Sequence, residues 1–111
     1  MKKKKKENSF QPALIKKLKA QFPGCYVMKN DANYKQGFPD LSVLLPNGLW
    51  AQLECKRAAE EVPKKDSNQL IYINDLSTKG FARFIYPENE EEVLNDLRRY
   101  SSRIGEQTCN I

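Results

Sequence analysis

The stretch from residue 37 to residue 57, GFPDLSVLLPNGLWAQLECKR, constrains the fold more than any other part of the chain. Its two hydrophobic segments are joined by Pro46-Asn47-Gly48, and such a turn between strand-like segments is typical of a β-hairpin. The turn can have two residues, Asn47-Gly48, or three, with Pro46 and Asn47 in a type I turn and Gly48 as the left-handed residue of a G1 bulge. The choice decides which side chains share a face, because side chains alternate along a strand.

The two turns give different partners to Asp40. A two-residue turn places Asp40 opposite Cys55, so that Asp40 and Glu54 point to opposite faces of the hairpin. A three-residue loop pairs Asp40 directly with Glu54. We predict the three-residue loop, because Pro46 suits the first central position of a type I turn and Gly48 suits the left-handed position.

In this register the hairpin has one apolar face and one polar face. The apolar face holds Leu41, Val43, Leu45, Leu49, Ala51, Leu53 and Cys55. The polar face holds Asp40, Ser42, Gln52, Glu54 and Lys56. Two carboxylates about 4 Å apart, at an effective dielectric constant of about 20, repel each other by roughly 4 kcal/mol. We therefore expect cations between Asp40 and Glu54, supplied partly by Lys56 and partly by a divalent metal ion.

The available ligands select the metal. The chain has no histidine, which excludes Ser-His-Asp triads and histidine-ligated zinc. Oxygen ligands favour Mg²⁺, with Mn²⁺ as a second possibility. A metal held by Asp40 and Glu54, with Lys56 orienting water or stabilising the developing charge, predicts metal-dependent phosphodiester hydrolysis. Glu-x-Lys alone is more often a surface cross-strand charge pair, so the prediction depends on the whole constellation.

The charge of the chain is unevenly distributed. Residues 1–36 contain ten lysines and two acids, a net charge of +8, whereas residues 37–111 carry nine basic and twelve acidic residues, a net charge of −3. This asymmetry predicts a polyanionic partner, and we expect DNA. The residues expected to contact it are Lys3, Lys4, Lys5, Lys16, Lys29, Lys35 and Arg57. No helix carries an array typical of base readers, so recognition by shape and phosphate is expected.

The chain is expected to form one domain at residues 7–100, between a disordered basic tail (1–6) and a polar C-terminal tail (101–111). The lysine tail is either a solvated segment or a phosphate-binding arm. No segment is long and apolar enough to predict a membrane span, and no apolar region of a signal peptide follows the lysines. No membrane partner is therefore expected. Three cysteines without paired spacing predict a reducing cytoplasm, that of the host cell if the protein is viral.

The hydrophobic patterns predict an α/β chain of order α-β-β-β-α-β-α. The first helix is expected to begin at an N-cap, Asn8 or Ser9, with Pro12 in its first turn. A capping box of Asp66 and Gln69 predicts the start of the second helix. The expected elements are helix 9–22, strands 25–29, 40–45 and 49–56, helix 66–79, strand 81–86 and a helix from 87 to about 100.

This constellation resembles the PD-(D/E)xK nuclease superfamily, with Pro39-Asp40 as the PD motif and Glu54-Cys55-Lys56 as the ExK motif. Within that superfamily it is similar to the VRR-NUC family, the virus-type replication-repair nucleases. Further points of similarity are an acid near the start of a basic helix, a G-x-P-D segment, a Ser-Gln helix start and a Gly before the next strand. Their positions here are Glu7, Gly37-Phe38-Pro39-Asp40, Ser67-Asn68-Gln69 and Gly80, and the resemblance covers roughly residues 7–97.

The resemblance implies a restriction-endonuclease-like fold, with a mixed central β-sheet flanked by helices. It implies Mg²⁺ at Asp40 and Glu54, the Cys55 backbone carbonyl as a further ligand, and Lys56 as the catalytic lysine. It also implies that Gln69 reaches toward the site from the start of its helix, and that Glu7 lies near the metal. Gln69 can serve as a capping residue as well.

Small proteins of this family are similar to Holliday junction resolvases, which act as homodimers on four-way DNA junctions. The leading hypothesis is therefore a structure-selective, metal-dependent DNA endonuclease of viral or virus-derived origin, acting on branched DNA as a homodimer. One alternative is a nuclease that trims flapped or linear DNA, and another is a non-catalytic DNA-binding module with the nuclease fold. Trp50 and the aromatic residues of 81–86 are either interface residues or, as we favour, core residues.

Overall fold

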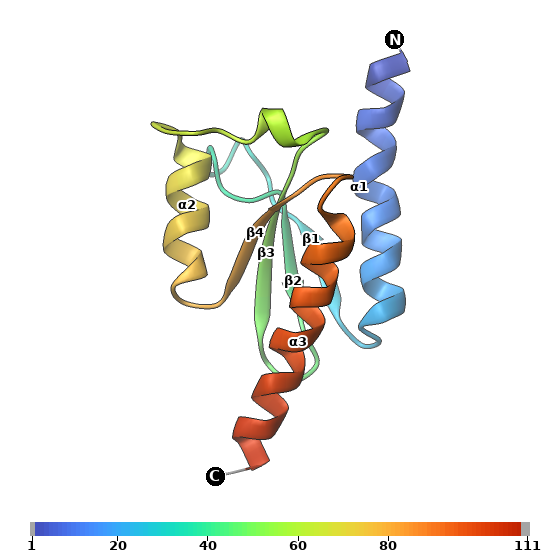
Figure 1. Ribbon diagram of the computed structural model, residues 1–111, viewed down its shortest axis with the longest axis vertical. Coiled ribbons are helices and arrows are strands. Elements are labelled where there is room, and N and C mark those ends of the chain that lie inside the picture. The colour runs from blue at the N-terminus through green and yellow to red at the C-terminus, as the bar shows by residue number, and fades with distance from the viewer. Residues whose placement is uncertain (1, 110–111) are drawn as a thin grey trace.

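The computed structural model describes the backbone of residues 2–109 and the side chains of residues 9–102. The element order α-β-β-β-α-β-α and the α/β class agree with the prediction (Figure 1). The elements are α1 (Lys2–Gln21), β1 (Tyr26–Lys29), β2 (Leu41–Leu44), β3 (Trp50–Cys55), the 3-10 turn η1 (Ala59–Glu61), α2 (Asn68–Ser77), β4 (Phe81–Ile85) and α3 (Glu90–Cys109).

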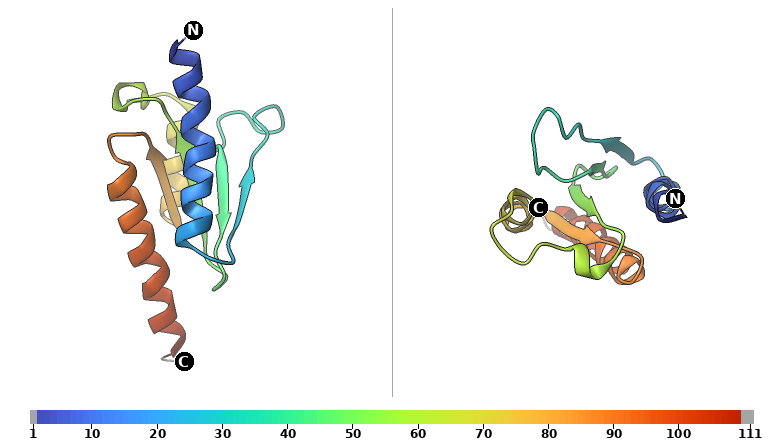
Figure 2. Two further views of the ribbon diagram at one scale, coloured as in Figure 1. Left: turned by 90° about the vertical axis from the view of Figure 1, so that its right-hand side faces the viewer. Right: turned by 90° about the horizontal axis from the view of Figure 1, so that it is seen from above.

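The four strands form one mixed sheet in the order β1-β2-β3-β4. The first two pairs are antiparallel, and β3 and β4 are parallel. The parallel pair needs a crossover connection, which η1 and α2 provide. Helices α1 and α3 cover one face of the sheet, and α2 lies on the other face (Figures 1 and 2).

The β2–β3 hairpin has the predicted three-residue loop. The Leu45 N–H donates to the Leu49 carbonyl at 2.8 Å, and the Gly48 N–H donates to the Leu45 carbonyl at 3.0 Å, which closes the type I turn. Gly48 has φ +90°, the left-handed value that glycine adopts without a steric penalty. Ser42 lies opposite Gln52, so the predicted register is confirmed.

The hydrophobic core lies between the apolar hairpin face and the two long helices. Spacing of four residues in α1 and of three or four in α3 places one apolar stripe of each helix against the sheet. The fully buried leucines, isoleucines and valines in this cluster are Leu14, Leu18, Leu41, Val43, Leu53, Ile85, Val93 and Leu97. Complete burial of each such side chain contributes about 1.5–3 kcal/mol relative to exposure.

Trp50 and the aromatic residues of β4 are partly or wholly buried. The ring of Trp50 lies so close to Gly80 that a Cβ there would come within 2.8 Å of it, which explains the glycine between α2 and β4. Phe81 packs beside Tyr100 with the ring centroids 5.4 Å apart. The fold therefore supports the prediction that these aromatic residues belong to the core and not to an interface.

Both long helices extend beyond their predicted ends. Helix α1 begins at Lys2, before the expected N-cap, and Pro12 lies inside it instead of in its first turn. Helix α3 continues through the expected C-terminal tail to Cys109, because no Gly or Pro interrupts it before residue 105. The side chains of residues 1–8 and 103–111 lie outside the described residues, and the disorder of the lysine tail stays a prediction.

The second helix starts one residue later than the capping box predicted. Ser67 is the N-cap: its backbone is extended, and its Oγ accepts a hydrogen bond from the Gln69 N–H at 3.1 Å. Asp66 has φ +52°, whereas an N-cap residue takes an extended φ, so Asp66 does not cap the helix. The helix ends at Ser77, short of the predicted Lys79.

Among residues 2–109, no helix combines the length and the apolar character needed to span a membrane.

Candidate active site

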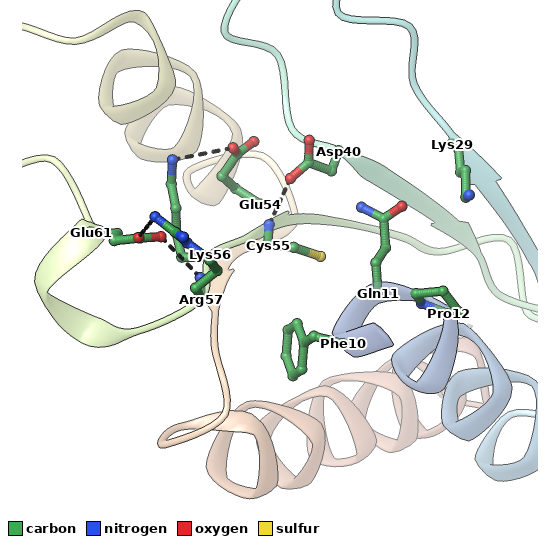
Figure 3. Close-up of a pocket in the computed structure, with 10 residues that line it drawn as sticks. All are labelled: Phe10, Gln11, Pro12, Lys29, Asp40, Glu54, Cys55, Lys56, Arg57 and Glu61. Carbon is green, nitrogen blue, oxygen red and sulfur yellow. Dashed lines mark hydrogen bonds and ion pairs between the residues drawn. The ribbon is translucent and has the colours of Figure 1, made fainter. Parts of the chain in front are cut away.

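A cavity of about 410 Å³ lies where β2 begins and β3 ends. The hairpin register brings Asp40 and Glu54 together there, and Lys56 and Arg57 follow directly from β3 (Figure 3). The lining residues are Phe10, Gln11, Pro12, Lys29, Asp40, Glu54, Cys55, Lys56, Arg57 and Glu61. Six of them are among the residues that the sequence predicted for the site.

Asp40 is held by the backbone of the neighbouring strand. Its Oδ2 accepts a hydrogen bond from the Cys55 N–H at 2.8 Å. The next N–H along the chain, that of Lys56 directly after β3, donates to the Ile85 carbonyl of β4 at 2.9 Å, on the side opposite to β2. In a strand the N–H and C=O of one residue project to the same neighbour, so the Cys55 carbonyl also points to the Asp40 side. This direction agrees with the implied role of that carbonyl.

Glu54 is the charged residue most deeply buried in the site, with 3% of its surface exposed. Its burial and, next, the negative charge of Asp40 raise the pKa of Glu54 to about 7, against an opposing effect of Lys56. The Lys56 Nζ lies 3.7 Å from Glu54 Oε2. Glu54 Oε1 is buried and has no hydrogen-bond donor among the described residues. A hydrogen bond between the carboxyl groups of Glu54 and Asp40 would require one of the two to carry a proton.

The residues fit an oxygen-binding divalent cation. A buried carboxylate oxygen without a donor is unusual, and a cation is one of the partners that explain it. The candidate ligands are the carboxylates of Asp40 and Glu54 and the carbonyl of Cys55, a hard oxygen set that suits Mg²⁺ or Mn²⁺. In the described part of the chain, no cluster of three or more His, Cys, Asp or Glu side chains is arranged to hold a metal. Mg²⁺ commonly uses one or two carboxylates and completes its shell with water.

When no metal is bound, the Cys55 thiol ionises less readily than an ordinary cysteine. Burial, followed by the negative charge of Asp40, raises the pKa of this thiol to about 12. The thiol is therefore protonated at neutral pH, and only thiolates bind metals or attack electrophiles well. Cys55 contributes to the site through its backbone, while its side chain packs against the core.

Glu61 and three residues of α1 line the cavity although the sequence did not point to them. Glu61 forms an ion pair with Arg57 and accepts a hydrogen bond from the Arg57 N–H at 3.1 Å. It comes from η1, a segment that reads as a polar linker. Gln11 comes from α1 and reaches the site because the helix runs along the sheet and past the end where the cavity lies (Figures 1 and 3). No local pattern in the sequence marks either residue.

Several predicted residues do not line the cavity. Lys16 and Lys35 are exposed elsewhere, on α1 and on the loop after β1. Gln69 lies in the first turn of α2, which packs against the Gly37 turn: a Cβ on Gly37 would come within 2.5 Å of Asn68 Cβ. Gln69 is thus near the segment that carries Asp40, outside the cavity wall. The side chains of Glu7, Lys3, Lys4 and Lys5 lie outside the described residues.

One solved structure agrees with the fold of this chain. No family model and no curated protein matches the sequence. A solved structure described as "VRR_NUC domain" matches with a TM-score of 0.65 and 25% sequence identity, over 86% of this chain and 97% of that chain. The match in fold, over nearly all of both chains, and the meeting of Asp40, Glu54 and Lys56 in one cavity support the assignment of this chain to the VRR-NUC family of nucleases.

Proposed function

We propose that the protein is a Mg²⁺-dependent endonuclease that hydrolyses phosphodiester bonds in DNA. The observation that carries the proposal is the state of Glu54: a buried carboxyl group beside a second one, with an oxygen that has no donor among the described residues. Burial of a charged Glu54 beside the carboxylate of Asp40 is unfavourable without a compensating cation. The ion pair with Lys56 compensates only part of this cost, and a divalent cation would compensate the rest.

Asp40 and Glu54 would hold the ion together with the Cys55 carbonyl. When bound, Mg²⁺ supplies Lewis-acid chemistry by polarising a phosphoryl group and by making water more acidic. The hydrogen bond from the Cys55 N–H fixes the Asp40 carboxylate before any substrate arrives. Such preorganisation lowers the barrier because no ligand has to be reoriented during the reaction.

Lys56 is the cationic side chain that pairs with Glu54 at this site. Its ammonium group lies beside Glu54 and lines the same cavity, where it can donate to the attacking water or to the negative charge that develops on phosphate oxygens. Lys29 and Arg57 line the same cavity and can bind the phosphates on either side of the cleaved bond. Arg57 would exchange its Glu61 partner for a phosphate, which is an equivalent bidentate acceptor.

The substrate within this proposal is branched DNA, cut by a homodimer. The net charge of +8 in residues 1–36 supports binding to the phosphates of DNA. The choice of branched DNA and of a homodimer rests on the similarity of small VRR-NUC proteins to Holliday junction resolvases. Symmetric incision of a four-way junction requires two sites related by a two-fold axis. A nuclease acting on flapped or linear DNA would use the same site, and a non-catalytic module would have no use for the buried acid pair.

A cleavage assay tests the proposal. End-labelled four-way junction, flap, single-stranded and linear duplex DNA are incubated with Mg²⁺ or with chelator, and Asp40→Asn serves as the inactive control. Paired symmetric nicks in the junction alone, dependent on metal, are expected. Cutting of every substrate would remove the junction selectivity, and binding without cutting by the wild-type protein would overturn the nuclease proposal. Sedimentation velocity on the same sample measures the oligomeric state.

A further inference from the structure

Asn30, at the end of β1, connects both ends of the loop that carries Asp40. Its backbone N–H donates to the Asp40 carbonyl at 2.8 Å. Its side-chain Nδ2 donates to the Pro39 carbonyl at 2.9 Å and to Ser42 Oγ at 2.9 Å. A side-chain amide nitrogen has two hydrogens, so both are used in these two bonds. One residue thus holds the backbone at Pro39 and Asp40 and the side chain of Ser42.

The direction of these bonds is determined by their chemistry. A carbonyl oxygen can only accept, so the Asn30 side chain must present Nδ2 to Pro39. Ser42 Oγ has one hydrogen, and its shortest acceptor is Gln52 Oε1 at 2.9 Å, compared with 3.3 Å to Asn30 Oδ1. Ser42 is buried, with 8% exposed, and lies opposite Gln52 in the hairpin. The result is a series of hydrogen bonds from Pro39 through Asn30 and Ser42 to Gln52 of β3.

The loop between these bonds is also anchored near its end, where Gly37 packs against Asn68 and the Phe38 ring contacts the Tyr72 ring with the centroids 5.3 Å apart. Residues 31–36 are exposed, and most of the bonds within the loop join residues of the loop to one another. The Asp40 carboxylate accepts a hydrogen bond from one N–H outside the loop, that of Cys55 at the end of β3. Its position relative to β3 therefore has to be well defined. The Asn30 bonds join the Asp40 backbone to the end of β1 and, through Ser42 and Gln52, to β3, which fixes the backbone from which the carboxylate projects.

We propose that Asn30 is a positioning residue for Asp40, supported by Ser42 and Gln52. The catalytic consequence depends on the proposed function, in which Asp40 binds the metal. Asn30 does not line the cavity and acts only through Asp40. Residues that orient a metal ligand in this way typically change metal affinity or activity by about 10- to 100-fold when mutated.

Asn30→Asp is the sharpest variant, because it keeps the shape of the side chain and replaces both donors by an acceptor. Asn33→Asp is the matched control: it introduces the same charge in the same loop at an exposed side chain. The first readout needs no metal. Amide hydrogen exchange of the Cys55 N–H, measured by NMR, reports directly on its bond to Asp40, and we expect about tenfold faster exchange in Asn30→Asp. Asn33→Asp should exchange like the wild type.

The second readout is the Mg²⁺ affinity measured by calorimetry, and the third is the separation of kcat from KM. We expect Asn30→Asp to weaken Mg²⁺ binding by about 10- to 100-fold and to lower kcat, with KM for DNA unchanged because the phosphate-binding lysines are intact. If Asn30→Asp does not fold, Ser42→Ala, which removes the middle of the series of hydrogen bonds, is measured in the same way.

Unchanged Cys55 exchange in a folded Asn30→Asp variant, or in Ser42→Ala if that variant is needed, would overturn the positioning role. Equal changes in Asn33→Asp would overturn it too, because the effect would then come from charge alone. If the wild-type protein neither binds Mg²⁺ nor cuts DNA, the proposed function fails. The exchange measurement would then still decide whether Asn30 positions Asp40.

Discussion

The two faces of the β2–β3 hairpin are built from alternating residues of the same strands, yet their energetics are opposite. The apolar face buries Leu41, Val43 and Leu53 against α1 and α3 and contributes stability. The polar face buries Glu54 beside Asp40, which opposes folding when both are charged. The comparison indicates that the first face stabilises the protein and that the second has a cost in stability, which the proposed metal ion would offset.

The largest expected effect is the loss of cleavage on changing the polar face. Asp40→Asn should abolish cleavage and lower Mg²⁺ affinity, since a metal ligand is lost. Lys56→Ala should lower cleavage by at least about 10²-fold, because a group that stabilises developing charge is removed, while Mg²⁺ and DNA still bind. Single-turnover cleavage, calorimetry and a DNA-binding titration measure the three quantities.

Lys79→Ala is the control for these variants, because Lys79, just after α2, forms an exposed ion pair with Asp75. Its cleavage rate should equal that of the wild type. Full cleavage by Lys56→Ala would remove the lysine from the mechanism, and unchanged Mg²⁺ affinity of Asp40→Asn would contradict its role as a ligand.

The second prediction concerns the apolar face. Leu53→Ala should lower the free energy of unfolding by about 2–5 kcal/mol, since Leu53 is fully buried and the variant leaves a cavity. Urea denaturation followed by circular dichroism measures this quantity. At temperatures where the variant remains folded, cleavage should persist. A loss of less than about 1 kcal/mol would contradict the role of this face as the source of stability.

The third prediction concerns Glu54, which follows Leu53 in the strand and lies on the polar face. Its burial makes the free energy of unfolding depend on pH. The pKa of Glu54 is raised to about 7 from an ordinary value of 4.5, first by burial and then by Asp40. Between these two pH values the folded chain binds more protons than the unfolded chain. Without metal, the stability that Glu54 contributes is fully present below pH 4.5 and is lost as the pH rises to about 7.

Glu54→Gln tests this relation, because the variant keeps the shape and removes the charge. At pH 8 in chelator it should be more stable than the wild type by on the order of 1–3 kcal/mol, and inactive. Its stability should also depend less on pH in this window. Mg²⁺ should stabilise the wild type more at pH 8 than at pH 5, since binding needs the ionised carboxylate. If Glu54→Gln is less stable than the wild type at pH 8, the claim that the charge of Glu54 destabilises the metal-free protein is wrong.

The smallest expected effect concerns the lysine run, which lies outside both faces. Deletion of residues 2–6 should weaken DNA binding by about tenfold and make its salt dependence less steep, since fewer phosphates are contacted. The cleavage rate at saturating DNA should not change, because the polar face is intact. Binding measured at several salt concentrations tests this, and an unchanged salt slope would make the run a solvated tail.

The sequence predicted what depends on nearby residues. The three-residue loop follows from the conformational preferences of Pro46 and Gly48, and the loop determines the register that joins Asp40 to Glu54. The start of α2 shows the limit of this reasoning. Asp66 and Ser67 are both good N-caps by residue type, and the left-handed backbone of Asp66, where the chain enters the helix, decided in favour of Ser67.

By itself, the sequence determined the element order, the hairpin register and the three residues Asp40, Glu54 and Lys56, because short-range turn geometry and strand alternation control them. Only the tertiary structure decided that Gln11 and Glu61 line the cavity and that Asn30 holds the Asp40 loop. These contacts depend on how α1, η1 and β1 pack around the end of the sheet. Packing of that kind is the sum of many weak contacts along the whole chain, and no local pattern of residues encodes it.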